Sequence, residues 1–192
     1  MRWVLIRHGL TRGNLEGRYI GCRTDEPLCE EGIEALREKR YPPVQRVFSS
    51  PMKRCLETAA ILYPGVPVEI IPAFRECDFG LFENKNHAEL NGRRDYQAWI
   101  DSGGELPFPQ GESRKAFSAR CRQAFRELRD RKIAGDCAVI VHGGTVMAIM
   151  EAWAQPPAGY YDFRVKNGQG FILEENGAYS LIFPGSANAA SS

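Results

Sequence analysis

The chain has 192 residues, a length that suits a single ordinary domain, and its 43% hydrophobic residues are enough to bury a sizeable core. Its formal net charge of +1 gives it no overall attraction for nucleic acid or for an anionic membrane, so any affinity for an anion has to be local. No apolar stretch approaches transmembrane length, and the apolar run near the amino terminus is too short for a signal peptide. We therefore expect a cytoplasmic protein that binds neither nucleic acid nor membrane.

Six cysteines are scattered along the chain without a CxxC pair, and there are three histidines. Cysteine and histidine spacings of this kind argue against a structural zinc site. In a chain of this length without a secretion signal, reduced thiols are the expected state. The cysteines are Cys22, Cys29, Cys55, Cys77, Cys121 and Cys137.

The first half of the chain alternates strand patterns with helix patterns. Short apolar runs at residues 3–6, 46–49 and 68–71 are typical of buried strands. Residues 30–40 and 52–63 have the spacing of amphipathic helices, and proline follows each of them. This half therefore predicts three strands separated by helices.

The segment 82–112 has a different composition, since it is polar, aromatic and rich in glycine and proline. We predict an inserted cap of short helices and loops over one end of the sheet. Residues 1–184 are predicted to form a single domain that includes this cap. The small, polar tail at residues 185–192 is predicted to be disordered.

The second half continues the alternation. Residues 117–128 place apolar side chains on one side of a long helix. The basic side chains elsewhere on this helix could bind nucleic acid, but a solvated helix face is far more common, and we expect a solvated face. Residues 137–141 form the most apolar strand, which we expect Gly143 and Gly144 to turn into an apolar helix at residues 145–154.

Strands that alternate with helices predict a mainly parallel sheet covered on both faces, a three-layer α/β/α sandwich. Two final strands, at residues 171–174 and 179–183, flank a turn. In such folds, ligands gather at the carboxyl ends of the parallel strands. Polar side chains follow each of the first four predicted strands: Arg7 and His8, then Ser49, Ser50 and Arg54, then Arg75 and Glu76, and finally His142.

Two histidines, two arginines and a glutamate at one edge of a sheet suit phosphoryl transfer. Arginine offers a rigid fork of donors for phosphate oxygens, and two forks can enclose a phosphoryl group. A neutral imidazole nitrogen is a competent nucleophile, and a second imidazole, if protonated, can donate to the equatorial oxygens. A glutamate can protonate the leaving oxygen and later deprotonate a water. Because the guanidinium groups supply positive charge, this chemistry needs no metal ion.

The same residues lie in motifs that resemble the histidine phosphatase superfamily, also called the phosphoglycerate-mutase-like family. The motifs occupy residues 5–14, 21–28, 49–54, 75–80, 111–113 and 141–144. The resemblance implies a phosphoglycerate-mutase-like fold with His8 as the phosphorylated nucleophile. It also implies that Arg7, Arg54 and His142 complete the phosphate pocket and that Glu76 donates the proton.

The resemblance extends to residues around the phosphate. It places Thr11 and Asn14 in the loop that helps to hold the phosphoryl oxygens, and it implies that Gly143 presents its backbone to the same group. Ile20 and Gly21 match positions that touch substrate in the mutase relatives, and the apolar Ile20 could do so only through its backbone.

Each of these residues also has a plainer interpretation. His8 alone would be a hydrogen-bonded histidine at the end of a strand, and Arg54 could form a surface ion pair with Glu57. Asp78 and Glu83 lie close enough to compete with Glu76 for the role of proton donor. In the cap, Tyr96 and Trp99 could cover a ligand ring, although packing onto the core is the commoner fate of such aromatic residues.

The resemblance implies a phosphoric monoester hydrolase of the histidine acid phosphatase type. It would act on a small phosphorylated metabolite without cofactor or metal. The α-ribazole-phosphate phosphatases are one similar subgroup. The sequence departs from the family at Cys29, where relatives commonly carry threonine, and at Asn84, which opens the cap. The cap is shorter than in the mutases, which favours hydrolysis. The alternatives are a phosphoglycerate mutase-type transferase and a catalytically inactive protein that binds a phosphorylated ligand.

Overall fold

The computed structural model describes residues 1–183, so the predicted disordered tail at residues 185–192 lies outside the described residues. Within residues 1–183, one six-stranded sheet has the strand order β3-β2-β4-β1-β5-β6. The strands are β1 (Arg2–Arg7), β2 (Arg46–Ser49), β3 (Val68–Ile70), β4 (Cys137–Val141), β5 (Gly170–Glu174) and β6 (Tyr179–Leu181). The helices are α1 (Arg12–Leu15), α2 (Glu30–Arg37), α3 (Lys53–Leu62), α4 (His87–Leu90), α5 (Arg94–Asp101), α6 (Arg114–Asp130) and α7 (Gly143–Trp153).

The sheet is mainly parallel, as predicted. β4 pairs in parallel with β1 on one side and β2 on the other, and β2 pairs in parallel with β3. β5 and β6 form an antiparallel pair at the β1 edge. All five residues of β4 are buried, which explains why this strand is apolar throughout rather than alternating.

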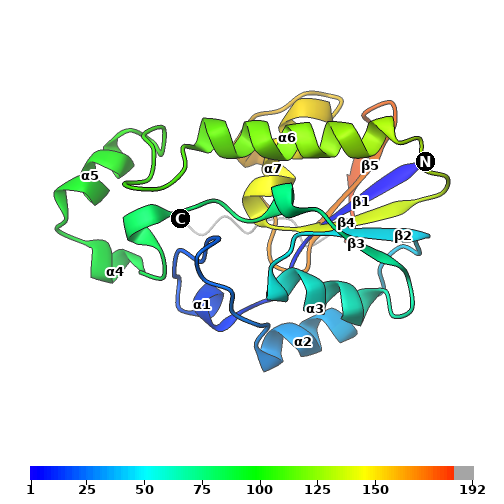
Figure 1. Ribbon diagram of the computed structural model, residues 1–192, viewed down its shortest axis with the longest axis horizontal. Coiled ribbons are helices and arrows are strands. Elements are labelled where there is room, and N and C mark those ends of the chain that lie inside the picture. The colour runs from blue at the N-terminus through cyan, green and yellow to red at the C-terminus, as the bar shows by residue number, and fades with distance from the viewer. Residues whose placement is uncertain (184–192) are drawn as a thin grey trace.

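Helices cover both faces of the sheet, and the side chains of β1 show why. Trp3 and Leu5 pack into one core cluster with residues of α6 and α7, whereas Val4 and Ile6 pack into another with residues of α3. Since successive side chains of a strand point to opposite faces, an all-apolar strand needs a cover on each side. Figure 1 shows α6 and α7 on one side of the sheet and α2 and α3 on the other, which confirms the three-layer arrangement.

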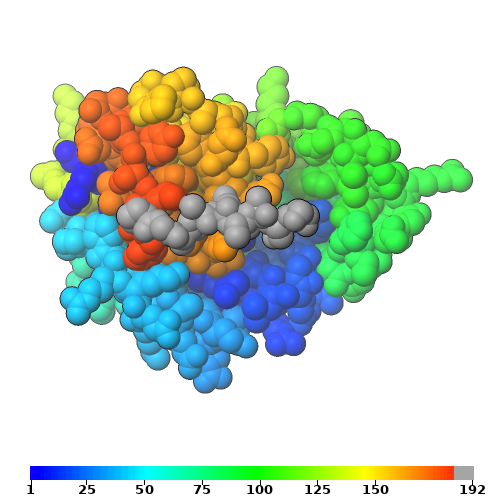
Figure 2. Space-filling model, turned by 180° about the vertical axis from the view of Figure 1, so that it is seen from behind, coloured from blue at the N-terminus to red at the C-terminus, as the bar shows by residue number. Residues whose placement is uncertain are grey.

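Residues 82–112 lie beyond one end of the sheet and contain the short helices α4 and α5 (Figure 1). A third apolar cluster joins this cap to the core, with Phe82, Leu90 and Tyr96 from the cap packed with Phe117 of α6. Tyr19 also packs against the cap rings. From behind, the green cap region lies beside the blue amino-terminal segment (Figure 2).

The bounds of three predicted helices were wrong. α2 ends at Arg37, whereas the predicted helix covered residues 30–40. Gly143 and Gly144 do not form a turn, because α7 begins at Gly143 with His142 as its N-cap residue. Likewise, Met52 precedes α3 as its N-cap residue, and the helix begins at Lys53. α7 therefore starts two positions after the end of β4, and α3 starts four positions after the end of β2. Within residues 1–183, no helix is both long enough and apolar enough to cross a membrane.

Candidate active site

Three neighbouring parallel strands bring the predicted site residues together. β1, β4 and β2 end at the same edge of the sheet, and they are followed by His8, His142 and Ser50. The rings of His8 and His142 have centroids 5.3 Å apart and planes inclined by 68°. His8 is 3% exposed and His142 is fully buried. The strand order alone therefore pairs two imidazoles that are 134 residues apart in the sequence.

The ring of His8 is held in one tautomer. Its Nδ1 lies 2.7 Å from the carbonyl oxygen of Gly9, which can only accept a hydrogen bond, so Nδ1 carries the proton. Burial, followed by the positive charges of Arg54 and Arg7, lowers the pKa of His8 well below 6.5. The free imidazole is therefore neutral at physiological pH, and its Nε2 has an available lone pair.

The same loop is tied to α3. The Gly9 amide donates to Oγ1 of Thr58 over 3.0 Å, and that hydroxyl donates to the carbonyl oxygen of Arg54 over 2.6 Å. The position of the His8 loop is thus linked to the helix that carries Arg54.

Arg54 and Arg7 each leave one donor free inside the protein. Arg54 is fully buried and donates to the carbonyl oxygens of Thr24 over 2.9 Å and Gly21 over 3.2 Å, and Arg7 donates to Val165 over 2.9 Å. The Nε atoms of both arginines are buried without a hydrogen-bond partner among the described residues. Because an unpaired buried donor is costly, two such donors beside His8 indicate a binding site for an anion.

The ring of His142 lies between Ser50 and Glu76. Its Nε2 is 2.8 Å from Oγ of Ser50, and its Nδ1 is 3.6 Å from Oε2 of Glu76. Burial and the charge of Arg54 lower the pKa of His142 well below 6.5. The ring is therefore neutral in the free protein. A bound anion would favour the protonated form of His142. In that form the ring can donate to phosphate oxygens, as expected from the sequence.

Glu76 is the carboxyl group that faces His142. Its Oε1 accepts a hydrogen bond from the amide of Cys77 over 2.9 Å, and burial raises its pKa above the usual 4.5. The two competing carboxyl groups are engaged elsewhere. Asp78 forms an ion pair with Arg23 at 2.8 Å, and Glu83 accepts from the backbone amides of Gly21 and Arg23. This geometry favours Glu76 over both alternatives.

Thr11 and Asn14 organise the loop after His8. Each side chain accepts from the other's backbone amide, so the two residues form a capping box at the start of α1. Oδ1 of Asn14 also accepts from Nδ2 of Asn167 over 2.9 Å, and the same Nδ2 lies 3.2 Å from the carbonyl oxygens of His8 and Gly9. Asn167 was absent from the predicted site. Its only sequence signal is its place before Gly168 in a turn, which does not indicate what the side chain contacts.

Gly143 lies at the amino-terminal end of α7, beside Arg7. A Cβ atom on Gly143 would be 3.4 Å from Nε of Arg7. The first turn of a helix presents unpaired amide groups and the positive end of the helix dipole. The predicted backbone role of Gly143 toward a phosphoryl group is consistent with this position.

Ile20 and Gly21 lie behind Arg54. The carbonyl oxygens of Ile20 and Gly21 are 3.5 and 3.2 Å from the same guanidinium nitrogen of Arg54, and the Gly21 amide donates to Glu83 over 3.0 Å. The side chain of Ile20 is buried. These contacts give both residues a role in holding Arg54, whereas direct contact with a substrate stays a prediction.

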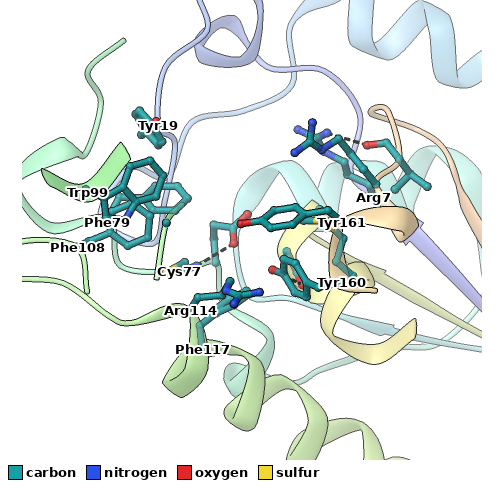
Figure 3. A pocket seen from close by; sticks show the side chains of 17 residues that line it. Arg7, Tyr19, Cys77, Phe79, Trp99, Phe108, Arg114, Phe117, Tyr160 and Tyr161 are labelled. Atoms are coloured by element: carbon teal, nitrogen blue, oxygen red, sulfur yellow. Dashed lines mark hydrogen bonds between the residues drawn. The ribbon is translucent and has the colours of Figure 1, made fainter. Parts of the chain in front are cut away.

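A pocket of about 330 Å³ extends from this site toward the cap. Arg7, Glu76 and Gly143 are among the residues that line it. Figure 3 shows Arg7 on the side of the pocket opposite Trp99 and Phe108. The other walls of the pocket are largely aromatic and include Tyr19, Phe79, Trp99, Phe108, Phe117, Tyr160 and Tyr161, together with the charged side chains of Arg114 and Arg164. The pocket thus combines a polar end suited to an anion with a mainly aromatic chamber suited to the rest of a ligand. The described residues contain no group of three or more His, Cys, Asp or Glu side chains arranged to hold a metal ion.

The fold and this site define an α/β protein in which two buried imidazoles and two guanidinium groups with unpaired Nε donors meet at the carboxyl edge of a mainly parallel sheet. Residues 3–179 match the histidine phosphatase superfamily (branch 1), and the chain belongs to this family.

Several relatives carry names that describe an activity. The adenosylcobalamin/alpha-ribazole phosphatase of Salmonella typhimurium is 30% identical over 177 residues, which cover 88% of this chain and 87% of that protein. The 2,3-bisphosphoglycerate-dependent phosphoglycerate mutase 2 of Gloeobacter violaceus is 32% identical over 161 residues, which cover 77% of this chain and 73% of that protein.

Similar solved structures are named as an alpha-ribazole phosphatase and a phosphoglycerate mutase. The alpha-ribazole phosphatase from Shigella flexneri superposes with a TM-score of 0.82 at 27% identity, over 94% of each chain. The phosphoglycerate mutase from Thermus thermophilus gives a TM-score of 0.73 at 29% identity, over 95% of this chain and 99% of that one. Both likenesses confirm the phosphoglycerate-mutase-like fold.

Proposed function

We propose that this protein is a phosphoric monoester hydrolase of the histidine phosphatase type, which forms a phosphohistidine on His8. The observation that carries the proposal is the 2.7 Å contact between Nδ1 of His8 and the carbonyl oxygen of Gly9, which keeps Nε2 unprotonated. The unpaired Nε donors of Arg7 and Arg54 supply the matching anion site. A nucleophile and a cradle for its electrophile are thus present together.

The reaction proceeds in two halves. In the first, Nε2 of His8 bonds to phosphorus, the bond from phosphorus to the leaving oxygen breaks, and Glu76 protonates that oxygen. In the second, Glu76 takes a proton from water, the water oxygen bonds to phosphorus, and the bond to Nε2 breaks. The raised pKa of Glu76 suits a group that must begin as an acid.

Fixed positive groups stabilise the charge that develops on the phosphoryl oxygens. The guanidinium groups of Arg7 and Arg54, the start of α7 and a protonated His142 all serve this purpose. Because these groups supply the charge, we expect turnover without a divalent cation and no loss of activity on chelation. The cytoplasmic location expected from the sequence stays a prediction.

Trapping of the intermediate tests this proposal. During turnover of labelled p-nitrophenyl phosphate, the wild-type protein should carry acid-labile, alkali-stable phosphate on His8. The His8→Ala variant should lose both label and turnover, by about 10³-fold or more. His87→Ala, which changes an exposed histidine of α4, is the matched control and should behave as the wild type. Acid-stable label on another residue, or undiminished turnover by His8→Ala, would refute the phosphohistidine route.

The chamber beside the site supports a ring-bearing substrate. Relatives at 28–30% identity are named adenosylcobalamin/alpha-ribazole phosphatases, and α-ribazole is a benzimidazole nucleoside. We therefore propose α-ribazole phosphate, or a phosphate of similar shape, as the substrate. Trp99 and Phe108, with centroids 5.0 Å apart, belong to the cap wall that would face the ring.

Selectivity between two substrates tests this assignment. Trp99→Leu should lower kcat/KM for α-ribazole phosphate by about 2- to 13-fold, the value of one aromatic contact of 0.5–1.5 kcal/mol. It should leave kcat/KM for glycerol phosphate within about twofold, because that substrate has no ring. Equal losses on both substrates would mean that Trp99 acts only in packing of the cap.

Because some relatives are named phosphoglycerate mutases, mutase activity is the second candidate function. Incubation with 3-phosphoglycerate, primed with the bisphosphate, separates the two reactions because a mutase produces 2-phosphoglycerate and a phosphatase releases inorganic phosphate. We expect release of phosphate to dominate. Failure to process any member of a broad phosphate panel would instead favour a binding protein without catalytic activity.

A further inference from the structure

Glu76 lies on a segment that secondary structure does not hold in place. After β3, a single 3₁₀ turn spans Pro72–Phe74, and residues 75–79 have no helix or strand assignment. A proton donor has to lie within hydrogen-bond reach of the leaving oxygen. A loop without other contacts would not hold the carboxyl group of Glu76 in such a position. Contacts from outside the loop must therefore fix its path.

Arg120 of α6 contacts this loop on the amino-terminal side of Glu76. Its Nη1 donates to the carbonyl oxygens of Ala73 over 2.6 Å and Arg75 over 3.0 Å. Its Nε and Nη2 donate to the carboxylate of Glu112 over 2.8–3.1 Å. Every nitrogen of the guanidinium group is thus engaged, and the planar fork is fully used.

Glu112 contacts the loop on the carboxyl-terminal side of Glu76. Its Oε2 accepts from the amide of Asp78 over 3.1 Å, and its own amide donates to the carbonyl oxygen of Asp78 over 2.9 Å. Gly111 allows this close approach, since a Cβ atom there would collide with the carbonyl oxygen of Asp78. The loop and the end of the cap therefore pack backbone to backbone.

From these contacts we propose that the Arg120–Glu112 ion pair is a positioning device for Glu76. Arg120 binds the backbone at Arg75, and Glu112 binds the backbone at Asp78. Together they fix the segment between these two residues, in which Glu76 lies. This inference rests on the proposed function, in which Glu76 is the proton donor. Neither residue lines the pocket, so both act through Glu76 rather than on the substrate.

The burial of the pair suits this role. The side chains of Arg120 and Glu112 are only 19% and 20% exposed, and their closest contact is 2.8 Å. A partly buried, bidentate arginine–carboxylate pair is geometrically more specific than a surface pair. Loss of the Arg120–Glu112 pair should therefore misplace the carboxyl group of Glu76, and it should not simply weaken the packing of α6 against the cap.

Dependence on the leaving group distinguishes the two effects. A misplaced proton donor slows the release of an alkoxide, which needs protonation, far more than the release of p-nitrophenolate, which does not. Arg120→Lys keeps the charge but loses the fork. We expect it to lower kcat for glycerol phosphate by about tenfold or more and kcat for p-nitrophenyl phosphate by less than about threefold, with KM nearly unchanged on both.

Arg122→Lys is the matched control, because Arg122 lies on the same helix and also binds a glutamate and a backbone carbonyl oxygen, those of Glu151 and Ala148. These contacts join α6 to α7 and do not reach the Glu76 loop, so this variant should keep the wild-type ratio of the two rates. Hydrogen exchange provides a second readout. The peptide that covers residues 73–80 should exchange faster in Arg120→Lys and at the wild-type rate in Arg122→Lys.

Equal losses of kcat on the two substrates, or unchanged exchange at residues 73–80, would overturn the proposal. If Arg120→Lys does not fold, Glu112→Gln decides the question by the same two measurements, since its single acceptor oxygen can no longer accept from both Arg120 and the Asp78 amide as the two carboxylate oxygens do. If the wild-type protein hydrolyses neither phosphate, the proposed function fails, and hydrogen exchange alone then decides whether the pair fixes the loop.

Discussion

Two side chains of the site, His8 and Glu76, are pushed by burial toward opposite protonation states. Burial lowers the pKa of the imidazole of His8 and raises the pKa of the carboxyl group of Glu76, because in each case the neutral form is favoured. A neutral imidazole is the nucleophile and a neutral carboxyl group is the acid. The same physical cause therefore prepares both partners of the first step.

This pairing predicts an acidic optimum for hydrolysis. Because the pKa of His8 lies below 6.5, the nucleophile stays unprotonated as the pH falls through the usual histidine range. Because the pKa of Glu76 lies above 4.5, the acid is progressively lost as the pH rises through that higher value. A profile of kcat/KM for glycerol phosphate between about pH 4 and pH 9 should therefore decline on its alkaline side.

The Glu76→Gln variant assigns that decline to its residue. The variant should be slower at low pH, and its profile should no longer fall with the same apparent pKa on the alkaline side. His87→Asn, an exposed change, should leave the decline as it is. An alkaline limb that survives unchanged in Glu76→Gln would show that another group titrates there.

At the scale of elements, α7 depends on two glycines that differ in their surroundings. A Cβ atom on Gly144 would lie 2.8 Å from Cε1 of Phe117 and 3.3 Å from Oη of Tyr160, whereas on Gly143 it would lie no closer than 3.4 Å to any neighbour. The 2.8 Å approach at Gly144 is closer than real Cβ atoms come to a neighbour, whereas the 3.4 Å distance at Gly143 is an ordinary contact. Gly144 thus sets how closely α7 approaches α6.

Alanine at each position separates these effects. Gly144→Ala should lower the free energy of unfolding by about 1–3 kcal/mol, because the ring of Phe117 has to shift in a packed interior. Gly143→Ala should stay within about 1 kcal/mol of the wild type, since alanine favours a helix over glycine by about that amount. Urea unfolding at one pH measures both, and a Gly144→Ala variant as stable as Gly143→Ala would contradict this account.

Elements with a continuous apolar pattern could be predicted from the sequence. β2 and β4 have the predicted bounds, because buried strands read as short apolar runs. α1 could not be predicted in this way, since it has four residues and depends on a capping box between Thr11 and Asn14. Local patterns of this length recur too often to indicate a helix by themselves.

The site could be predicted as far as strand ends determine it. His8 and His142 meet because β1 and β4 are neighbours in the sheet, a consequence of parallel pairing. Asn167 and Arg120 escaped prediction because their contacts join segments that are far apart in the chain. The sequence shows which residue types follow the strands, but it does not show which distant loops return to hold them.

At the scale of the whole molecule, the sheet concentrates ionisable groups at one buried edge. Both imidazoles and one guanidinium group there are almost inaccessible to solvent, and Glu76 is 9% exposed. Burial of such groups opposes their charged forms, and the fold has to supply the free energy that this costs. The stability of the protein should therefore depend on pH in a way that the site determines.

The two histidines set the sign of that dependence. In the unfolded chain, His8 and His142 bind protons as the pH falls through about 6.5, whereas in the folded protein they do so only at lower pH. In the interval between, the unfolded chain binds more protons, so the free energy of unfolding falls as the pH falls, by up to about 1.4 kcal/mol per pH unit for each histidine. Glu76 acts in the opposite sense above pH 4.5, because its folded-state pKa is raised.

Urea unfolding between pH 7.5 and pH 5.5 tests this balance. The wild-type protein should lose stability steadily below about pH 6.5, since two histidines outweigh one carboxyl group. His8→Asn removes one of the two buried imidazoles and should reduce the slope by up to about 1.4 kcal/mol per pH unit. The exposed His87→Asn change should leave the slope as in the wild type. An unchanged slope in His8→Asn would mean that His8 takes up its proton equally readily in the folded and unfolded states, and the neutral nucleophile inferred from its burial would then be wrong.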